Sequence, residues 1–279
     1  MVRCLRALTR FQLRGAECIL GLGPMMAEKV AVYVGRPTSE AITQPPVGGV
    51  QNSQSSILNP QSSIATWVPL WSDPQLAPWP ENKPNPLRAE RGWGANEVVF
   101  LYSGNMGLGH RFNEFLEAAR RLGASGPRWV FAGGGKRRSE VEAFSRANPG
   151  AGINILGYAP HDSLGAHLCA ADVHLASLDS AWQGLMVPSK LQGSFAVGRP
   201  VLYVGGRQCE TAAWIQASGG GWIVDADDVD GLLAAIQQAL DPDERRRRGQ
   251  AALAFARQHF QMTENCNRIA RLLEGGTQK

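Results

Sequence analysis

The sequence predicts an α/β protein whose main part, residues 97–260, is a Rossmann-like parallel sheet covered by helices on both faces. Two patterns predict it. Short apolar runs alternate with segments whose apolar residues recur at the helical period, and glycine-rich turns follow several of the runs. The composition supports a packed core, because 44% of the 279 residues are hydrophobic and only 19% are charged.

Residues 1–36 are expected to be the last part of an amino-terminal domain whose beginning is missing from the chain. Residues 1–14 place four arginines among leucine and phenylalanine, which is typical of a basic amphipathic helix. Its apolar face would contact either a membrane surface or another part of the protein. Residues 17–22 are predicted to form a strand and residues 25–30 a helix, and one such unit cannot make a sheet alone.

Residues 37–96 are interpreted as a loop followed by a connector. Residues 37–63 are rich in Pro, Gly, Ser, Gln and Asn and nearly free of charge, which predicts a loop. Residues 64–70 fit a short strand. Residues 71–91 are rich in proline and contain Trp71 and Trp79, and we place the domain boundary in this connector.

Strands and helices are expected to alternate through the main domain. The strands are predicted at 98–102, 129–132, 153–156, 173–176, 201–204 and 222–224, and the helices at 111–122, 139–147, 164–171, 190–197, 210–217 and 229–240. Ser139 is expected to cap the second of these helices. Two terminal helices follow at 245–260 and 263–273. We assign residues 261–279 to a helix that packs back on the amino-terminal part, with Gly275 and Gly276 at its end.

Charge and cysteine content exclude several classes of function. A net charge of +4 is too small to indicate nucleic acid as a partner, but it fits an anionic substrate or a membrane surface. The five cysteines have no paired spacing, so neither a zinc site nor a disulfide framework is expected, and no metal is assigned. No stretch is long and apolar enough to span a bilayer. We expect a cytoplasmic protein, with a peripheral position at the inner membrane face as an alternative.

The stretch 182–191 is the strongest candidate for a binding site. It follows the strand at 173–176 and enters a helix near Pro188, a residue that is tolerated at helix starts. Ser189 and Lys190 then fall in the first turn, where backbone N–H groups, a hydroxyl and an ammonium converge on one anion. In the ordinary alternative, Ser189 is only a cap and Lys190 a solvated charge. The position after a strand in a βα series favours the binding site.

Three further loops follow strands and are suited to a phosphate or a nucleotide. Glycines in them let backbone N–H groups approach a ligand, a histidine could donate to a phosphate, and a tyrosine could edge a planar base. The alternatives are a surface histidine, a solvated basic turn and a packing tyrosine. The candidates are Gly104, Asn105, Gly107 and His110 in the first loop, Gly133, Gly134 and Lys136 in the second, and Tyr158 and Pro160 in the third.

Other nucleotide-binding and catalytic motifs are absent from the sequence. After the first loop the next strand ends in Phe131-Ala132-Gly133, without the acidic residue that holds a ribose in dinucleotide-binding folds. There is no Gly-Lys-Ser or Gly-Lys-Thr phosphate loop, no serine nucleophile elbow and no pair of metal ligands.

Five motifs resemble a known family when they are taken as a set. They are Leu101-Tyr102-Ser103-Gly104-Asn105-Met106-Gly107, Phe131-Ala132-Gly133-Gly134-Gly135, Ala170-Ala171-Asp172-Val173-His174-Leu175, Val187-Pro188-Ser189-Lys190-Leu191 and Ala196-Val197-Gly198-Arg199-Pro200. This set is similar to the carboxyl-terminal domain of family 4 glycosyltransferases with the GT-B fold. Among these, the bacterial enzymes that make exopolysaccharide or colanic-acid-type sugars are the most similar.

The resemblance implies a metal-independent, retaining enzyme without a cofactor, which holds a nucleotide-sugar donor, usually UDP-linked, in this domain. A separate amino-terminal domain would hold a saccharide or lipid-linked acceptor. Lys190, helped by His110, would stabilise charge on the leaving diphosphate. The resemblance places the diphosphate near Gly104, Asn105, His110, Ser189 and Lys190, the base near Tyr158 and Pro160, and the donor sugar near Gln183, Gly184 and Leu185. Gly107, Gly133, Gly134, Lys136, Pro188 and Gly193 complete the donor-binding set, and Lys190, His110 and Gln183 are the catalytic candidates.

The chain departs from the family pattern at four of these positions. The family often has arginine and lysine where Asn105 and His110 stand. It also has two glutamates around the Pro-Ser-Lys motif, where this chain has Gln183 and Gly193, and the second glutamate contacts the ribose. A glutamine can hydrogen-bond a sugar hydroxyl but carries no charge.

The function expected from these features is sugar transfer in cell-surface polysaccharide biosynthesis by an amino-terminally shortened enzyme. Two alternatives stay open. One is a non-catalytic remnant that binds a nucleotide sugar, and the other is a sugar-nucleotide epimerase of the same fold, for which no catalytic carboxylate set is evident.

Overall fold

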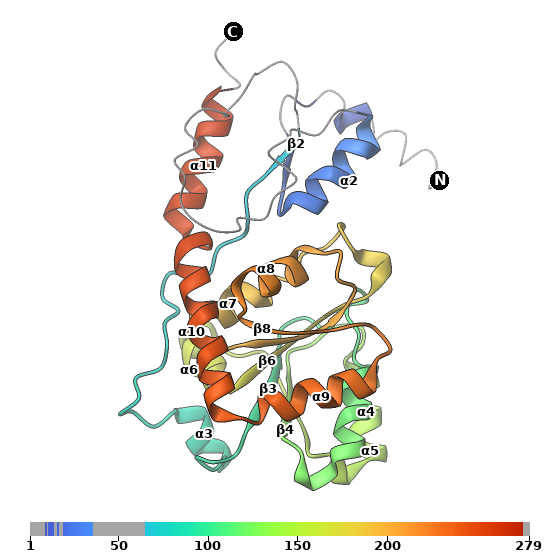
Figure 1. The fold of residues 1–279 in the computed structure, drawn as a ribbon, viewed down its shortest axis with the longest axis vertical. Helices are drawn as coiled ribbons and strands as arrows, with labels where there is room; N and C mark the ends of the chain where they lie inside the picture. The colour runs from blue at the N-terminus through green and yellow to red at the C-terminus, as the bar shows by residue number, and fades with distance from the viewer. Residues whose placement is uncertain (1–8, 10, 14–15, 17–18, 36–64, 276–279) are drawn as a thin grey trace.

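The computed structural model describes residues 9, 11–13, 16, 19–35 and 65–275. In these residues a six-stranded sheet forms a large unit and a two-stranded sheet a smaller one (Figure 1). The expected amphipathic helix at 1–14 lies mostly outside the described residues, and the loop expected at 37–63 lies wholly outside them.

The large sheet is entirely parallel and has the strand order β5-β4-β3-β6-β7-β8. The chain starts at the centre with β3, builds outward through β4 and β5, and then returns to the other side of β3 with β6. The order in which successive strands are added to the sheet therefore reverses between β3 and β6. Open α/β sheets bind ligands at such a point. The strands are β3 (Val99–Ser103), β4 (Arg128–Ala132), β5 (Ile153–Leu156), β6 (Val173–Leu178), β7 (Val201–Gly205) and β8 (Gly221–Val224).

Helices cover both faces of this sheet, as the sequence predicts for a Rossmann-like domain. Helices α4 (Asn113–Leu122) and α9 (Val229–Ala239) pack on one face, together with Val141 of α5 (Arg138–Ala147). The other face carries α7 (Lys190–Ala196), α8 (Glu210–Ser218) and α10 (Pro242–His259), while α6 (Leu164–Cys169) lies beside α3 (Pro86–Arg91). Short 3₁₀ turns stand at Gly123–Ser125, Pro149–Ala151, His161–Ser163 and Ser180–Trp182.

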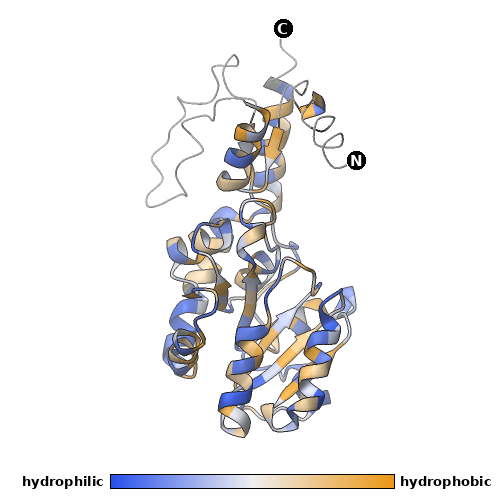
Figure 2. Ribbon diagram, turned by 90° about the vertical axis from the view of Figure 1, so that its right-hand side faces the viewer, coloured by the Kyte–Doolittle hydropathy of each residue, from blue (hydrophilic) through white to orange (hydrophobic). Residues whose placement is uncertain are grey.

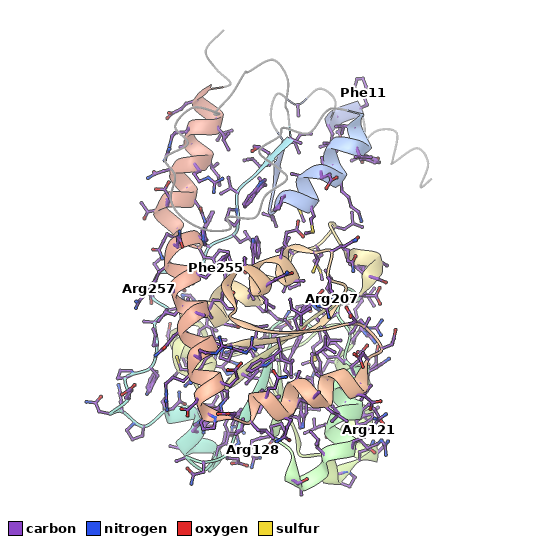
Figure 3. The ribbon with its side chains drawn as sticks, in the orientation of Figure 1. Phe11, Arg121, Arg128, Arg207, Phe255 and Arg257 are labelled. Atoms are coloured by element: carbon purple, nitrogen blue, oxygen red, sulfur yellow. The ribbon has the colours of Figure 1, made fainter. Side chains whose placement is uncertain are left out.

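The core forms because successive residues of a strand point to opposite faces of the sheet. In β3, Phe100 and Tyr102 enter the cluster under α4 and α9, whereas Val99 and Leu101 enter the cluster on the opposite face. All four side chains are buried, so β3 is apolar on both of its sides from Val99 to Tyr102. Figure 2 shows these hydrophobic strands enclosed between helices, and Figure 3 shows Phe255 and Arg257 on opposite sides of α10.

The predicted fold class and its six strands are confirmed, with strand ends that differ by one or two residues. The structure adds to or differs from the sequence analysis at three places. Residues 86–91 form helix α3, which begins at Pro86 because Asn85 accepts hydrogen bonds from two backbone N–H groups of its first turn. Ser139 lies inside α5 and does not cap it. Pro188 lies before α7, which begins at Lys190 with Ser189 as its cap residue.

The smaller unit is a βαβ unit. Strands β1 (Ile19–Gly21) and β2 (Ala65–Trp67) pair in parallel, and α2 (Pro24–Val34) packs on both. The terminal helix α11 (Met262–Gly275) lies beside this unit. Asn265 donates to the backbone carbonyl of Pro69, and the guanidinium of Arg268 lies over the ring of Trp67. No described helix combines the length and the apolar character that crossing a membrane requires.

Two segments join the small unit to the large one, and they touch each other. The connector after β2 passes α10 and α11 where these two helices meet, and the N–H of Ser72 donates to the carbonyl of Phe260 over 3.2 Å. A cavity of about 350 Å³ lies at this crossing and is lined by connector residues, α10 and the start of α11. Farther along, Arg88 of α3 pairs with Asp172 and donates to the carbonyl of Ala170, which fixes the connector to the amino ends of the strands.

Candidate functional site

The loops after β3, β4 and β5 are joined by backbone hydrogen bonds at the carboxyl edge of the sheet. Gly104 donates to the carbonyl of Ala132 over 2.9 Å, and Met106 donates to the carbonyl of Gly134 over 2.6 Å. Gly133 in turn donates to the carbonyl of Leu156 over 3.1 Å. The first two predicted loops therefore form one continuous surface with the end of β5.

Two positions in this surface require glycine. Gly133 has φ = 125°, and a Cβ on it would lie 2.1 Å from the carbonyl oxygen of Gly104. Gly135 has φ = 123°, and a Cβ there would lie 2.6 Å from the carbonyl oxygen of Met106. Any side chain would separate the two loops, because neither backbone can move away without breaking its hydrogen bonds.

Lys190 reaches from the start of α7 to the point where β3 and β6 diverge. Its Nζ lies 3.2 Å from Nε2 of His110 and 4.6 Å from the ring centroid of Tyr102. A Cβ on Gly104 would lie 3.3 Å from Cε of Lys190, so the lysine lies directly against the backbone of the first glycine loop. Burial lowers the pKa of Lys190 to about 8, because desolvation disfavours the charged form. The side chain is still mostly protonated at neutral pH.

His110 is buried at the other side of this lysine. Its Nδ1 lies 2.8 Å from the carbonyl oxygen of Ser177, which can only accept, so Nδ1 carries the proton. The lone pair on Nε2 then faces the ammonium of Lys190, which donates to it. Burial, with smaller contributions from Lys190 and Arg137, lowers the pKa of His110 to about 4. His110 is therefore a neutral acceptor here and not the donor that the sequence analysis expects.

The other residues of the Pro-Ser-Lys motif flank this lysine. Pro188 is buried, whereas Ser189 is exposed and makes no capping hydrogen bond with its side chain. The Ser189 hydroxyl thus has no role in holding α7 together.

Two of the predicted contact residues in the first two loops, Asn105 and Lys136, are both exposed. The amide of Asn105 lies between two glycines: a Cβ on Gly107 would be 3.2 Å from its Nδ2, and one on Gly135 would be 2.4 Å from its Oδ1. Lys136 is exposed, and among the described residues it forms no ion pair. The neighbouring Arg137 and Arg138 are paired with Glu140 and Glu142, so only Lys136 of this basic run is not already neutralised.

Tyr158 lies over the second loop. A Cβ on Gly134 would be 3.1 Å from its ring, and one on Gly133 would be 3.3 Å from it, yet 63% of the side chain is exposed. One face of the ring therefore covers the glycines and the rest is open to a ligand. Pro160 is exposed two residues farther on.

The stretch expected to face the donor sugar touches the small unit. The carbonyl of Gln183 accepts a hydrogen bond from Lys29 of α2, and a Cβ on Gly184 would lie 2.9 Å from Cδ of Lys29. The amide of Gln183 lies against Gly206 after β7. Leu185 is 61% exposed. The loop after β6 is therefore held between the two units.

Gly193 does not lie in this surface. A Cβ on it would point toward Leu168 of α6, at 3.3 Å, and toward Leu76 of the connector, at 3.6 Å. A side chain there would enter the packing between α7 and α6 and would not reach the glycine loops. The structure thus separates Gly193 from the other predicted site residues.

The sequence analysis missed two residues near the site. Tyr102 was assigned to a strand, but the ammonium of Lys190 also lies over its ring. Its hydroxyl donates to the carbonyl of Asn105. Glu210, the first residue of α8, is buried and accepts a hydrogen bond of 2.7 Å from the N–H of Met26 at the start of α2. An acidic residue at the start of the helix that follows β7 was the available signal, because loops at carboxyl strand ends face the same side.

The comparison with known families identifies the family to which this domain belongs. Residues 97–242, which are 146 of the 279 residues, match the family described as glycosyl transferases group 1. The chain belongs to this family. The matched range contains the whole six-stranded sheet and every site residue discussed above except those of α2.

A named relative of this chain is consistent with the family assignment. The chain is 32% identical over 167 residues to the putative colanic acid biosynthesis glycosyl transferase WcaI of Escherichia coli K12. The alignment covers 55% of this chain and 38% of WcaI, so the chain spans well under half the length of that relative.

Solved structures confirm the GT-B type of fold for this glycosyl transferase. Sucrose-phosphate synthase from Thermosynechococcus elongatus superposes with a TM-score of 0.72 at 17% identity, over 97% of this chain and 61% of that one. HepE from Anabaena, in complex with UDP-glucose, superposes with a TM-score of 0.69 at 12% identity, over 93% of this chain and 64% of that one. At these identities the likeness concerns the fold.

Proposed function

We propose that this chain carries the donor site of a family 4, retaining glycosyltransferase that uses a nucleotide-sugar donor, UDP-linked, without a metal ion. The acceptor in this proposal is a saccharide or a lipid-linked saccharide of cell-surface polysaccharide. The donor proposal is supported by HepE, which was solved with UDP-glucose, and the pathway proposal by the colanic acid assignment of WcaI.

One observation carries the proposal. Lys190 holds a single ammonium at the point where β3 and β6 diverge, against the backbone of Gly104 and with its desolvation only partly compensated by His110. A buried cation next to glycine backbone fits an anionic ligand, because the anion would replace the water that the lysine has lost. A diphosphate has the charge and size for this place.

The chemistry requires stabilisation of the leaving diphosphate more than it requires a nucleophile. As the bond between the anomeric carbon and the diphosphate oxygen breaks, negative charge grows on that oxygen, and a fixed cation aimed at it lowers the barrier. The acceptor hydroxyl attacks from the face that the diphosphate leaves and passes its proton to the departing diphosphate oxygen, so the anomeric configuration is retained. Gln183, between the units, is proposed to hydrogen-bond a hydroxyl of the sugar.

The first test is the loss of the ammonium. Lys190→Met keeps the length of the side chain but removes its charge, and we expect the affinity for UDP-glucose to fall about 10- to 150-fold, as for the loss of one charge-assisted hydrogen bond of about 1.5–3 kcal/mol. The measurement is calorimetric titration, with UDP, ADP-glucose and GDP-mannose as comparison ligands. Lys83→Met, in the connector, is the matched control and should bind like the wild type. Equal affinities of wild type and Lys190→Met would remove Lys190 from the donor site.

The second test concerns metal ions. Because the proposed site supplies its positive charge from side chains, binding of UDP-glucose should change less than about twofold when EDTA is added. Titrations with EDTA, with magnesium and with manganese provide the comparison. Loss of binding in EDTA that either metal restores would contradict the metal-independent mechanism.

A further inference from the structure

Without a bound anion, His110 and Lys190 form a hydrogen-bonded pair with one defined arrangement. In that state the neutral imidazole accepts from the ammonium over 3.2 Å, while Nδ1–H is committed to the carbonyl of Ser177 over 2.8 Å. His110 is only 5% exposed. If the ammonium of Lys190 moves away, Nε2 therefore has little access to water as a replacement hydrogen-bond donor. A buried ring nitrogen without a partner is costly, and the pair therefore responds to whatever Lys190 binds.

We propose that His110 takes up one proton from solvent when the donor diphosphate binds, and that it thereby changes from the acceptor of Lys190 into the second cation of the site. This inference rests on the proposed function, since it requires a diphosphate at Lys190. The proton bonds to Nε2, Nδ1–H keeps its bond to Ser177, and no other group gains or loses a proton in the step.

The surroundings explain why the proton is absent before binding. Lys190 of α7 faces Nε2 directly, and the guanidinium of Arg137, before α5, donates to the backbone carbonyl of His110. The phenol of Tyr102 in β3 packs edge-on against the imidazole with ring centroids 5.7 Å apart, and β6 contributes the Ser177 carbonyl. Burial first, and then the nearby charges of Lys190 and Arg137, disfavour an imidazolium and lower the pKa of His110 to about 4.

The acids nearest along the chain do not change this balance. The following residue, Arg111, is paired with Glu114 and also with Asp179 and Asp227, so each of these carboxylates contacts the guanidinium of Arg111. A bound diphosphate brings two negative charges to a site with one ammonium. When Lys190 turns toward a phosphate, its N–H leaves Nε2, and a protonated Nε2 then donates to the same anion.

The experiment measures proton uptake directly. UDP-glucose is titrated into the protein at about pH 6.5 in PIPES and in bis-Tris, whose heats of protonation differ, so the difference between the two binding enthalpies gives the number of protons taken up. In UDP-glucose the terminal phosphate is esterified by the sugar, so it lacks the ionisation that titrates near this pH in free UDP. The ligand therefore contributes no proton. We expect roughly 0.5–1 proton per ligand for the wild type, and an affinity that falls up to about tenfold for each pH unit between the pKa of free His110, about 4, and the higher pKa of bound His110, above which it levels off.

Two variants separate this role from a merely structural one. His110→Gln keeps an acceptor for the Lys190 ammonium but cannot be protonated, so it should bind UDP-glucose more weakly, without proton uptake and with an affinity independent of pH between about 6 and 7.5. His259→Gln, on α10 and outside the site loops, should keep the uptake of the wild type. Thermal unfolding of each variant checks that it is folded.

The outcomes distinguish the inference from the proposed function. Binding by the wild type with equal enthalpies in both buffers would overturn the proton uptake and leave the donor site standing. Uptake that persists in His110→Gln would assign the proton to another group and also overturn the inference. No binding of UDP-glucose, ADP-glucose or GDP-mannose would overturn the proposed function and the inference together.

Discussion

At the residue scale, buried histidines are the unusual feature of this domain. Besides His110, the strand residue His174 is buried and its Nε2 lies 3.0 Å from the carbonyl of Leu168. Burial lowers the pKa of His174 to about 3. Both side chains are therefore neutral in the folded protein at pH values where an unfolded histidine, with a pKa near 6.5, is already charged.

The sign of the resulting pH dependence follows from proton counting. Below about pH 6.5 the unfolded chain binds a proton at each of these histidines that the folded chain does not bind, so acid favours unfolding. We expect each histidine to cost about 2 kcal/mol of stability between pH 7 and 5, and the loss to continue toward the folded pKa values of about 4 and 3.

Urea unfolding at about pH 7 and pH 5 checks this expectation. His174→Gln can still donate to the carbonyl of Leu168, and it should lose about 2 kcal/mol less than the wild type over this range. His161→Gln is the matched control, because His161 is exposed, and it should lose as much as the wild type. An equal loss in His174→Gln would mean that another group causes the acid sensitivity.

The sequence could indicate which residues gather at the site, but not how they contact one another. The Pro-Ser-Lys motif and the glycine loops identified Lys190 and His110, because loops after parallel strands meet at one edge. The direction of the hydrogen bond between them depends on the Ser177 carbonyl, which comes from the backbone of another strand. Gly193 was misplaced for a similar reason: motif spacing gives its position along α7, but not the face that packs on Leu168.

At the element scale, glycines in the loops allow the backbones at the ends of three strands to approach each other closely and form one surface. The clearest case is Gly133, where both the backbone angle and the approach of Gly104 exclude a side chain. These loops and all six strands followed from the sequence because glycine, apolar runs and the helical period are local signals. Helix α3 did not, because its six residues are too few to show a period and lie in a proline-rich stretch.

The element-scale prediction is that Gly133→Ala is destabilising far beyond its size. The strained φ and the overlap with Gly104 should together cost roughly 2–4 kcal/mol of the free energy of unfolding. Gly150→Ala is the matched control, because a Cβ at Gly150 meets no atom within 4 Å, and its stability should change by less than about 0.5 kcal/mol. Chemical unfolding of both variants decides, and similar stabilities would contradict the close approach of the two loops.

At the scale of the whole molecule, the two units meet through a few specific contacts beside the site. Glu210 of α8 accepts from the N–H of Met26, and a Cβ on Gly23 would lie 2.1 Å from Cγ of Glu210, so the carboxylate lies directly at the start of α2. No side chain of α2 itself caps this end of the helix. The large unit therefore provides a cap for the small one, at the helix end where a negative charge is favourable.

Removal of this carboxylate should loosen α2 without unfolding the large sheet. In Glu210→Ala we expect amide hydrogen exchange at Met26 and its neighbours in α2 to become at least about tenfold faster, because a hydrogen bond to a charged group is lost. Exchange in β3 and β6 should change little. Glu28→Ala, an exposed position on α2, is the control. Unchanged exchange at Met26 would show that the other contacts of α2 suffice to hold it.

The crossing of the connector with α10 and α11 determines how the two units can move. Within the described residues, the chain passes between the units at this crossing, at Ser72 and at Phe260, and those two residues are hydrogen-bonded to each other. Any rotation of one unit relative to the other would therefore have to turn about this crossing. The cavity beside Phe260 gives neighbouring side chains room to shift during such a rotation. The contact between α2 and the loop after β6 lies away from this crossing. A small rotation at Phe260 would therefore displace α2 relative to Gln183 by a larger distance.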